Sequence, residues 1–162
     1  HRQKLLVEIK TTPADSPRML QHFNQRYGRQ LQQNHAWLHS MDLYAVQKLH
    51  RLNPKLAVMA IQPYVLGWPA RHVGWNVEYS MLNPLLIAQL HFKHQPICVW
   101  TVDDPDTMRQ AALMGVDGIV TDNLKDLDIA LKDTERHHDY AARLAAQLNV
   151  AYNWHNLIDG RR

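Results

Sequence analysis

The spacing of apolar residues along this chain alternates between two patterns, one typical of strands and one typical of helices. Short runs rich in β-branched residues predict strands, and the longer segments between them, where apolar residues recur every three or four positions, predict helices. The predicted strands cover residues 5–10, 36–39, 56–61, 97–102 and 116–121. Strands that alternate with helices in this way are typical of an α/β fold with a parallel sheet.

The clearest unit covers residues 97–122, ICVWTVDDPDTMRQAALMGVDGIVTD. Its first strand leads to Asp104, which is placed to cap a helix that begins with Pro105 and ends at Gly115. A second strand follows, parallel to the first, so the polar residues after both strands gather at one edge of the sheet. Ligands of α/β proteins bind at that edge.

Five strands of this kind fit two architectures. They complete an open doubly wound sheet, or they form five of the eight strands of a (β/α)₈ barrel. Residues 62–80 lack a clear period, and we interpret them as a long loop with Tyr64, Trp68, Trp75 and Tyr79. These aromatic residues either line a pocket or seal one end of the core.

Composition narrows the functional classes. The 162 residues are 46% hydrophobic, which is enough for one core, and the net charge is +3 with basic residues scattered along the chain. This scatter argues against a nucleic-acid surface. The single cysteine, Cys98, lies inside a predicted strand, and we interpret it as a buried residue. We expect a soluble chain without a signal peptide or a membrane span, in a compartment left open.

Glu8 and Lys10 alternate with apolar residues in the first predicted strand, so they share one face of it. If that face lies inside the fold, the two charges require partners and mark a site or a salt-bridge network. If the strand is at an edge, the face is simply solvated. The pattern of this strand leaves both alternatives open.

Histidines are scattered through most of the predicted elements. We interpret most of them as surface or half-buried residues without a catalytic role. They are His22, His35, His39, His50, His72, His91 and His94.

A series of short motifs at strand ends resembles the C-terminal part of the glycerophosphodiester phosphodiesterases. In chain order the motifs are Glu8-Ile9-Lys10, Ser40-Met41-Asp42, Glu78-Tyr79-Ser80 with Leu82-Asn83, Trp100-Thr101-Val102-Asp103, and residues 115–122, GVDGIVTD. The EYS and LN pair is most similar to forms from Gram-positive bacteria, in which this domain follows a membrane-spanning region. The resemblance covers residues 1–131 as the C-terminal portion of the domain and leaves residues 132–162 as a helical extension and tail.

The resemblance implies a (β/α)₈ barrel, here incomplete, and an enzyme that hydrolyses glycerophosphodiesters to an alcohol and glycerol 3-phosphate with a divalent metal, Mg²⁺ or Ca²⁺. It assigns Glu8 as a metal ligand, Lys10 as the cation beside the phosphate and Trp100 as a wall for the glycerol. Met41 stands where the family commonly has Phe. The family's two catalytic histidines belong to HRG and HD motifs that this chain lacks, so we expect the chain alone to be inactive.

Two hypotheses follow. Either the chain is a segment of such a phosphodiesterase, with a parent protein that is membrane-associated, or it is a self-contained α/β domain that binds a phosphorylated ligand or a protein partner without catalysis. An incomplete barrel would leave the strands at 5–10 and 116–121 with open edges. In that case we expect copies of the chain to self-associate.

Overall fold

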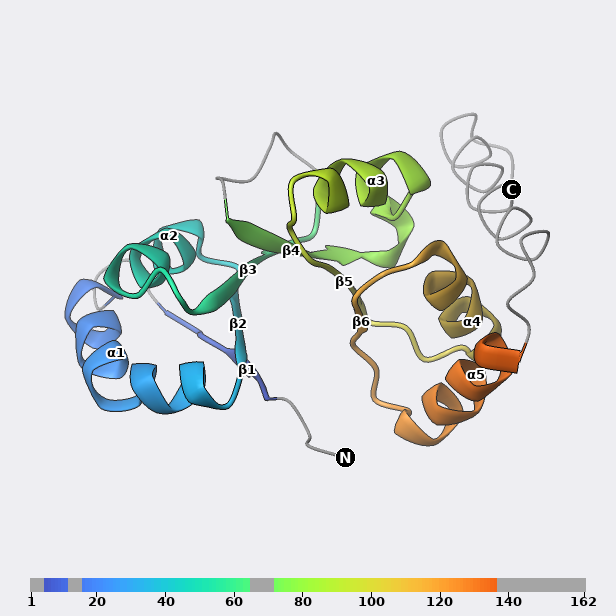
Figure 1. Ribbon diagram of the computed structural model, residues 1–162, viewed down its shortest axis with the longest axis horizontal. Coiled ribbons are helices and arrows are strands. Elements are labelled where there is room, and N and C mark those ends of the chain that lie inside the picture. The colour runs from blue at the N-terminus through green and yellow to red at the C-terminus, as the bar shows by residue number, and fades with distance from the viewer. Residues whose placement is uncertain (1–4, 12–15, 65–71, 137–162) are drawn as a thin grey trace. The chain divides into compact units, whose positions relative to one another are not determined.

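The computed structural model describes residues 5–11, 16–64 and 72–136. The chain divides into two compact units between Asn76 and Val77. The first unit contains β1 (Leu6–Glu8), α1 (Ser16–Gln33), β2 (Trp37–Ser40), α2 (Leu43–Leu52), β3 (Ala57–Gln62) and the start of β4 (Val73–Glu78) (Figure 1). The second contains the end of β4, the short 3₁₀ helix η1 (Tyr79–Met81), α3 (Pro84–Phe92), β5 (Ile97–Trp100), α4 (Pro105–Met114), β6 (Gly118–Ile119) and α5 (Leu124–Arg136).

In the first unit, β1, β2 and β3 are neighbours in that order and all pairs are parallel. One face of these strands packs on α1 and α2. The buried residues of this core include Leu20, Leu38, Val46, Leu49 and Val58. Because side chains alternate along a strand, the residues between them lie on the opposite face. That second face carries Glu8 beside His39, and His39 beside Met59.

In the second unit, β5 and β6 pair in parallel, with Cys98 opposite Gly118 and Val99 opposite Ile119. Helix α4 begins as its sequence predicts, since Asp104 caps it and accepts a hydrogen bond from the Thr107 N–H at 2.8 Å.

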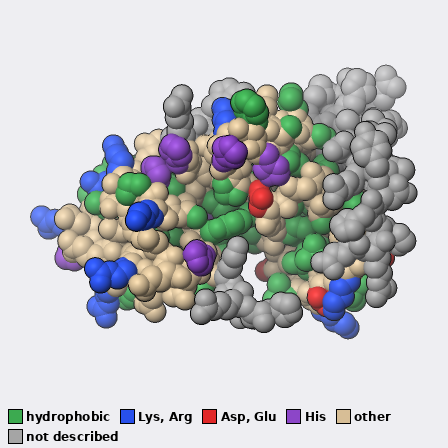
Figure 2. Space-filling view, in the orientation of Figure 1, with side chains coloured by type: hydrophobic (Ala, Val, Ile, Leu, Met, Phe, Trp, Pro, Cys, Tyr) green, Lys and Arg blue, Asp and Glu red, His purple; other side chains and the backbone are tan. Residues whose placement is uncertain are grey.

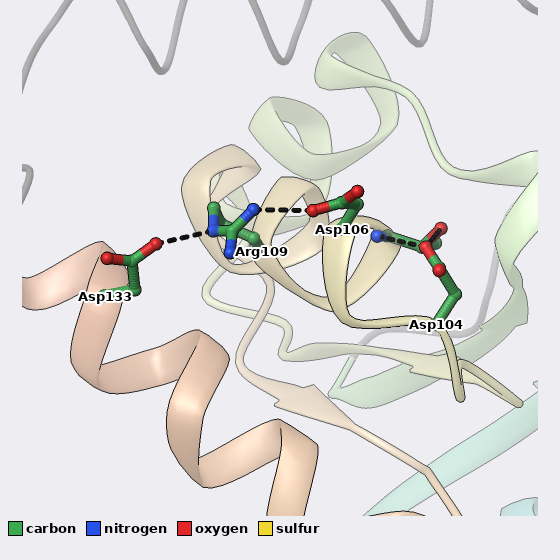
Figure 3. A network of polar contacts seen from close by, with 5 residues as sticks. Asp104, Asp106, Arg109 and Asp133 are labelled. Atoms are coloured by element: carbon green, nitrogen blue, oxygen red, sulfur yellow. Dashed lines mark hydrogen bonds and ion pairs between the residues drawn. The ribbon is translucent and has the colours of Figure 1, made fainter.

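Ion pairs link α4 to α5 (Figure 3). Arg109 contacts Asp106 at 2.7 Å within α4 and Asp133 of α5 at 2.9 Å. The pairs lie at the protein surface, where such contacts are weak. They therefore fix the pairing of the two helices more than they stabilise the unit.

Three helices end with a residue in the left-handed conformation. In α4 this residue is Gly115, at φ 90°. In α1 and α3 it is a histidine, His35 at φ 52° and His94 at φ 55°. After α3 the N–H groups of His94 and Gln95 bond back to the carbonyls of His91 and Leu90, both at 2.9 Å, which is the Schellman arrangement. A histidine in this conformation is strained where glycine would not be.

The predicted order of elements is confirmed, with one correction. Residues 62–80 contain a strand, β4, so the described residues form six strands rather than five. The sequence of β4, VGWNVE, has a glycine and an asparagine where a strand usually has apolar residues, and this hid its period. Trp75 of this strand is 1% exposed, so it is part of the core.

Other boundaries shift by a few residues. The first and last predicted strands are shorter than expected, and α5 continues to Arg136. Trp68 and most of the extension predicted over residues 132–162 lie outside the described residues, so the division at residue 131 stays a prediction. None of the helices described here has the length and apolar character needed to cross a bilayer.

Candidate functional site

A cleft of about 470 Å³ opens in the first unit where β1 and β2 end. It is lined by Glu8, Ile9, Lys10 and Thr11 from the end of β1, and by Ser40, Met41 and Asp42 from the end of β2. Both segments follow the carboxyl ends of parallel strands, which is where α/β folds bind ligands. The two motifs that the sequence placed at strand ends, at residues 8–10 and 40–42, therefore form one site.

Hydrogen bonds from the second motif hold the first in place. The Ser40 hydroxyl donates to the Ile9 carbonyl at 2.6 Å and accepts from the Asp42 N–H at 3.1 Å. The Asp42 carboxylate accepts from the Thr11 hydroxyl at 2.7 Å and from the Tyr44 N–H at 2.9 Å, which also caps α2. We call these contacts the strand-end latch. Its effect is to fix the backbone on both sides of Lys10.

The charged pair in the cleft is accessible. Lys10 Nζ lies 3.7 Å from a Glu8 carboxylate oxygen, and the two side chains are 82% and 39% exposed. Among the described residues β1 lies at one end of the strand order, and both charged side chains reach solvent. An exposed ion pair is held by less than about 1 kcal/mol, so a ligand can separate its partners at little cost.

Two carboxylates line this cleft, and carboxylate oxygens are the ligands that hard divalent cations prefer. Each oxygen of Asp42 accepts one hydrogen bond, from Thr11 or Tyr44, whereas the Glu8 carboxylate is paired with Lys10. Within the described ranges no group of three or more His, Cys, Asp or Glu residues could hold an ion. Mg²⁺ is commonly bound through one or two carboxylates, with water and substrate phosphate oxygens completing its coordination.

His39 is a residue that the sequence interpretation missed. It is 9% exposed and lies beside Glu8 on the face of the strands turned away from α1 and α2. Its ring Nδ1 is 2.9 Å from the side-chain nitrogen of Asn76 in β4. Burial lowers the pKa of His39, and the negative charge of Glu8 opposes that shift only in part. Leu38 is a core residue and side chains alternate along a strand, so the sequence could have placed His39 on the opposite face, which Glu8 shares.

Trp100, the third predicted site residue, belongs to the second unit. It is half-buried at the end of β5. Beyond it, the Asp103 carboxylate accepts hydrogen bonds from the Thr121 hydroxyl and the Asp122 N–H, both at 2.8 Å, and so joins the segments that follow β5 and β6. Glu8 and Lys10 are thus brought together in one cleft, whereas Trp100 is positioned by a separate set of contacts.

The basic side chains do not gather at the surface in view. Figure 2 shows Lys and Arg as separate blue groups on this face rather than as a continuous patch. Cys98, in β5, is buried, and burial together with nearby Asp117 raises the pKa of its thiol to about 12. This cysteine is therefore an inert core residue.

Comparison with known proteins shows the class of protein to which this chain is similar. A family model described as "Glycerophosphoryl diester phosphodiesterase family" matches residues 96–125. A protein of Bacillus subtilis (strain 168) named "Putative glycerophosphodiester phosphodiesterase YhdW" is 27% identical over 127 residues, which cover 73% of this chain and 52% of the relative. The resemblance drawn from the motifs is thus supported by a match to the same family.

Solved structures agree with the fold. The chain is similar to the "Putative glycerophosphoryl diester phosphodiesterase" of Silicibacter pomeroyi DSS-3, with a TM-score of 0.71, 23% identity and coverage of 82% of this chain and 51% of that one. It is also similar to an Oleispira antarctica phosphodiesterase solved with its product sn-glycerol-3-phosphate, with a TM-score of 0.70, 12% identity and coverage of 80% and 56%.

The chain therefore spans about half the length of the relatives it matches. Its fold is α/β, and its parallel β/α units correspond to part of a (β/α)₈ barrel, as predicted.

Proposed function

We propose that this chain is a segment of a metal-dependent phosphodiesterase that hydrolyses glycerophosphodiesters to an alcohol and glycerol 3-phosphate. The observation that carries the proposal is the cleft in which Glu8 and Lys10 lie 3.7 Å apart after the carboxyl end of β1. A carboxylate and an ammonium group at this position suit a cation and a phosphate. The family match over residues 96–125 and the names of the relatives support the same substrate class.

Each site residue has a separate role in this proposal. Glu8 is one ligand of the divalent metal, Mg²⁺ or Ca²⁺, and Lys10 is a point charge toward a phosphate oxygen. The metal, when bound, neutralises negative charge that develops on the phosphoryl group. Trp100 is a wall for the glycerol moiety. The strand-end latch holds the backbone that carries Glu8 and Lys10, which limits the reorganisation needed to bring both side chains to the ligand.

The chain alone is proposed to be inactive. The histidines that the family uses as general acid and base belong to motifs absent from these 162 residues. Loss of general acid–base catalysis removes a factor of roughly 10²–10⁴ in rate. A parent protein that supplies those motifs would be the active enzyme, and its association with a membrane stays a prediction.

The test compares the chain with a longer protein that contains it. Glycerol 3-phosphate released from glycerophosphocholine is measured with Mg²⁺ or Ca²⁺, and product is expected from the longer protein and not from the chain. In the longer protein, Glu8→Gln is expected to lower kcat far more than Trp100→Phe, because a metal ligand stabilises transition-state charge while a smaller ring retains part of a wall. Equal losses in the two variants would contradict the assigned roles.

We also propose that copies of the chain self-associate, either edge to edge through the first or the last strand or by exchange of the C-terminal helix. Among the described residues β1 pairs with β2 alone, and Leu5 and Leu6 are 55% and 41% exposed. A second copy can pair with such an edge. Light scattering coupled to size exclusion is expected to give a mass above the 18.9 kDa of one chain. A single monomer peak with cooperative unfolding would contradict this proposal.

A further inference from the structure

The imidazole of His39 lies next to the proposed metal ligand. Glu8 and His39 are register partners on adjacent parallel strands, so their Cα atoms are about 5 Å apart and their side chains share a face. His39 keeps 9% of its surface exposed, whereas Leu38 and Ser40, its neighbours on the other face, keep 1% each. The His39 side chain is thus mostly buried and shares its face of the sheet with Glu8.

Asn76 fixes the orientation of this ring. The two side chains meet at 2.9 Å although β3 lies between their strands, so both are turned to the same face. In this orientation of the amide, the Asn76 side-chain nitrogen donates and His39 Nδ1 accepts. The proton of the neutral ring is then on Nε2. Within the described residues, the bond to Asn76 is the one hydrogen bond recorded for the His39 side chain.

We propose that the His39 Nε2–H group donates a hydrogen bond to a phosphoryl oxygen of the ligand bound beside Glu8 and Lys10. This inference rests on the proposed function and deepens it by adding a second side chain, beside Lys10, that contacts the phosphate. Lys10 supplies charge without direction, whereas an imidazole N–H held by Asn76 supplies a donor with a fixed direction. A neutral donor also does not repel a cation bound at Glu8, whereas a second positively charged side chain would.

Two variants of His39 separate this role from a structural one. Glutamine places an amide N–H near the position of Nε2, and asparagine places its amide near the position of Nδ1. His39→Gln therefore keeps a donor toward the ligand and loses the contact with Asn76. His39→Asn keeps a partner for Asn76 and loses the donor. The probe is glycerol 3-phosphate with Mg²⁺, titrated into the full 162-residue chain by calorimetry and by ¹⁵N-resolved NMR, beside a urea unfolding curve for each variant.

The expected result is opposite rankings in the two measurements. The affinity for glycerol 3-phosphate should fall by about tenfold or more in His39→Asn and by less in His39→Gln, because a hydrogen bond to a charged acceptor is worth that much. Stability should be higher in His39→Asn than in His39→Gln. In the wild-type chain, the ¹⁵N shifts of the ring should show the proton on Nε2, and addition of ligand should change the Nε2 shift more than the Nδ1 shift.

Other results overturn the inference. If Lys10→Ala weakens binding and His39→Asn does not, the phosphate site stands and His39 is only a structural partner of Asn76. If the affinity follows stability, so that His39→Gln binds more weakly than His39→Asn, the ring also has no direct contact with the ligand. If the folded wild-type chain binds neither glycerol 3-phosphate nor inorganic phosphate at millimolar concentration, the inference and the proposed function fall together.

Discussion

Replacing Ser40 by alanine removes the centre of the strand-end latch. Ser40 is 1% exposed, and its hydroxyl makes one bond to the Ile9 carbonyl at 2.6 Å and one to the Asp42 N–H at 3.1 Å. Each such bond contributes about 1 kcal/mol net, and a polar group left buried without a partner costs about 1–3 kcal/mol. We therefore expect Ser40→Ala to lower the free energy of unfolding by about 2–3 kcal/mol.

Urea unfolding and hydrogen exchange measure this effect. If the free energy of unfolding falls by about 2 kcal/mol per M urea, the urea midpoint of Ser40→Ala should be lower than that of wild type by roughly 1 M. Exchange of the Asp42 amide proton should become about tenfold faster or more, because that N–H loses its acceptor. The affinity for Mg²⁺ and glycerol 3-phosphate should also fall, since the latch fixes the backbone around Lys10.

Ser80→Ala is the matched control for this change. Ser80 is exposed, and its hydroxyl contacts the Glu78 carboxylate at the protein surface. Its replacement should change stability by no more than about 0.5 kcal/mol. If Ser40→Ala shifted the midpoint no more than Ser80→Ala, with the exchange rate of the Asp42 amide unchanged, the latch would not hold the two strand ends together.

Three further predictions concern the second unit. The Cys98 thiol should resist alkylation until the chain unfolds. Its pKa is raised from 9.0 to about 12, so between these pH values the folded state keeps a proton that the unfolded state loses. The free energy of unfolding should therefore fall over this pH range more in wild type than in Cys98→Ala. Gly115→Ala should lower the free energy of unfolding by about 1 kcal/mol. The cause is backbone strain at positive φ and not a clash, since no atom lies within 4 Å of the added methyl group. His94→Gly relieves such strain and should raise the free energy of unfolding by roughly 0.5 kcal/mol in the same urea assay. Arg109→Met should cost less than about 1 kcal/mol, and a loss that persisted at about 1 M NaCl would contradict a surface ion pair as its origin.

Helices of this fold could be predicted closely because their ends carry chemical signals. Asp104 caps α4 as predicted, Asp42 and Asn83 cap α2 and α3, and each accepts a hydrogen bond from a backbone N–H of the first turn. Gly115 ends α4 in the left-handed conformation that other residues adopt only with strain. These signals act within a few residues, so the sequence alone is sufficient to read them.

Features that depend on distant partners could not be predicted. Strand β4 lacks a clear period because Asn76 occupies a buried position, and it does so as the hydrogen-bond partner of His39, 37 residues earlier in the chain. His39 itself looked like one more scattered histidine. The exposure of Glu8 and Lys10 depends on the place of β1 at one end of the described strand order, which is a property of the sheet and not of residues 5–10.

The order of strands in the first unit has a consequence for how the site is made during synthesis. Sheet neighbours follow chain order, so each new strand pairs with the one completed just before it. Every residue that lines the cleft lies between Glu8 and Asp42. A chain growing at about 5–20 residues per second therefore has all parts of the cleft outside the ribosome before most of the second unit has been translated. The cleft can thus be assembled before the strands of the second unit, which are added to a unit whose Glu8 and Lys10 are already in place.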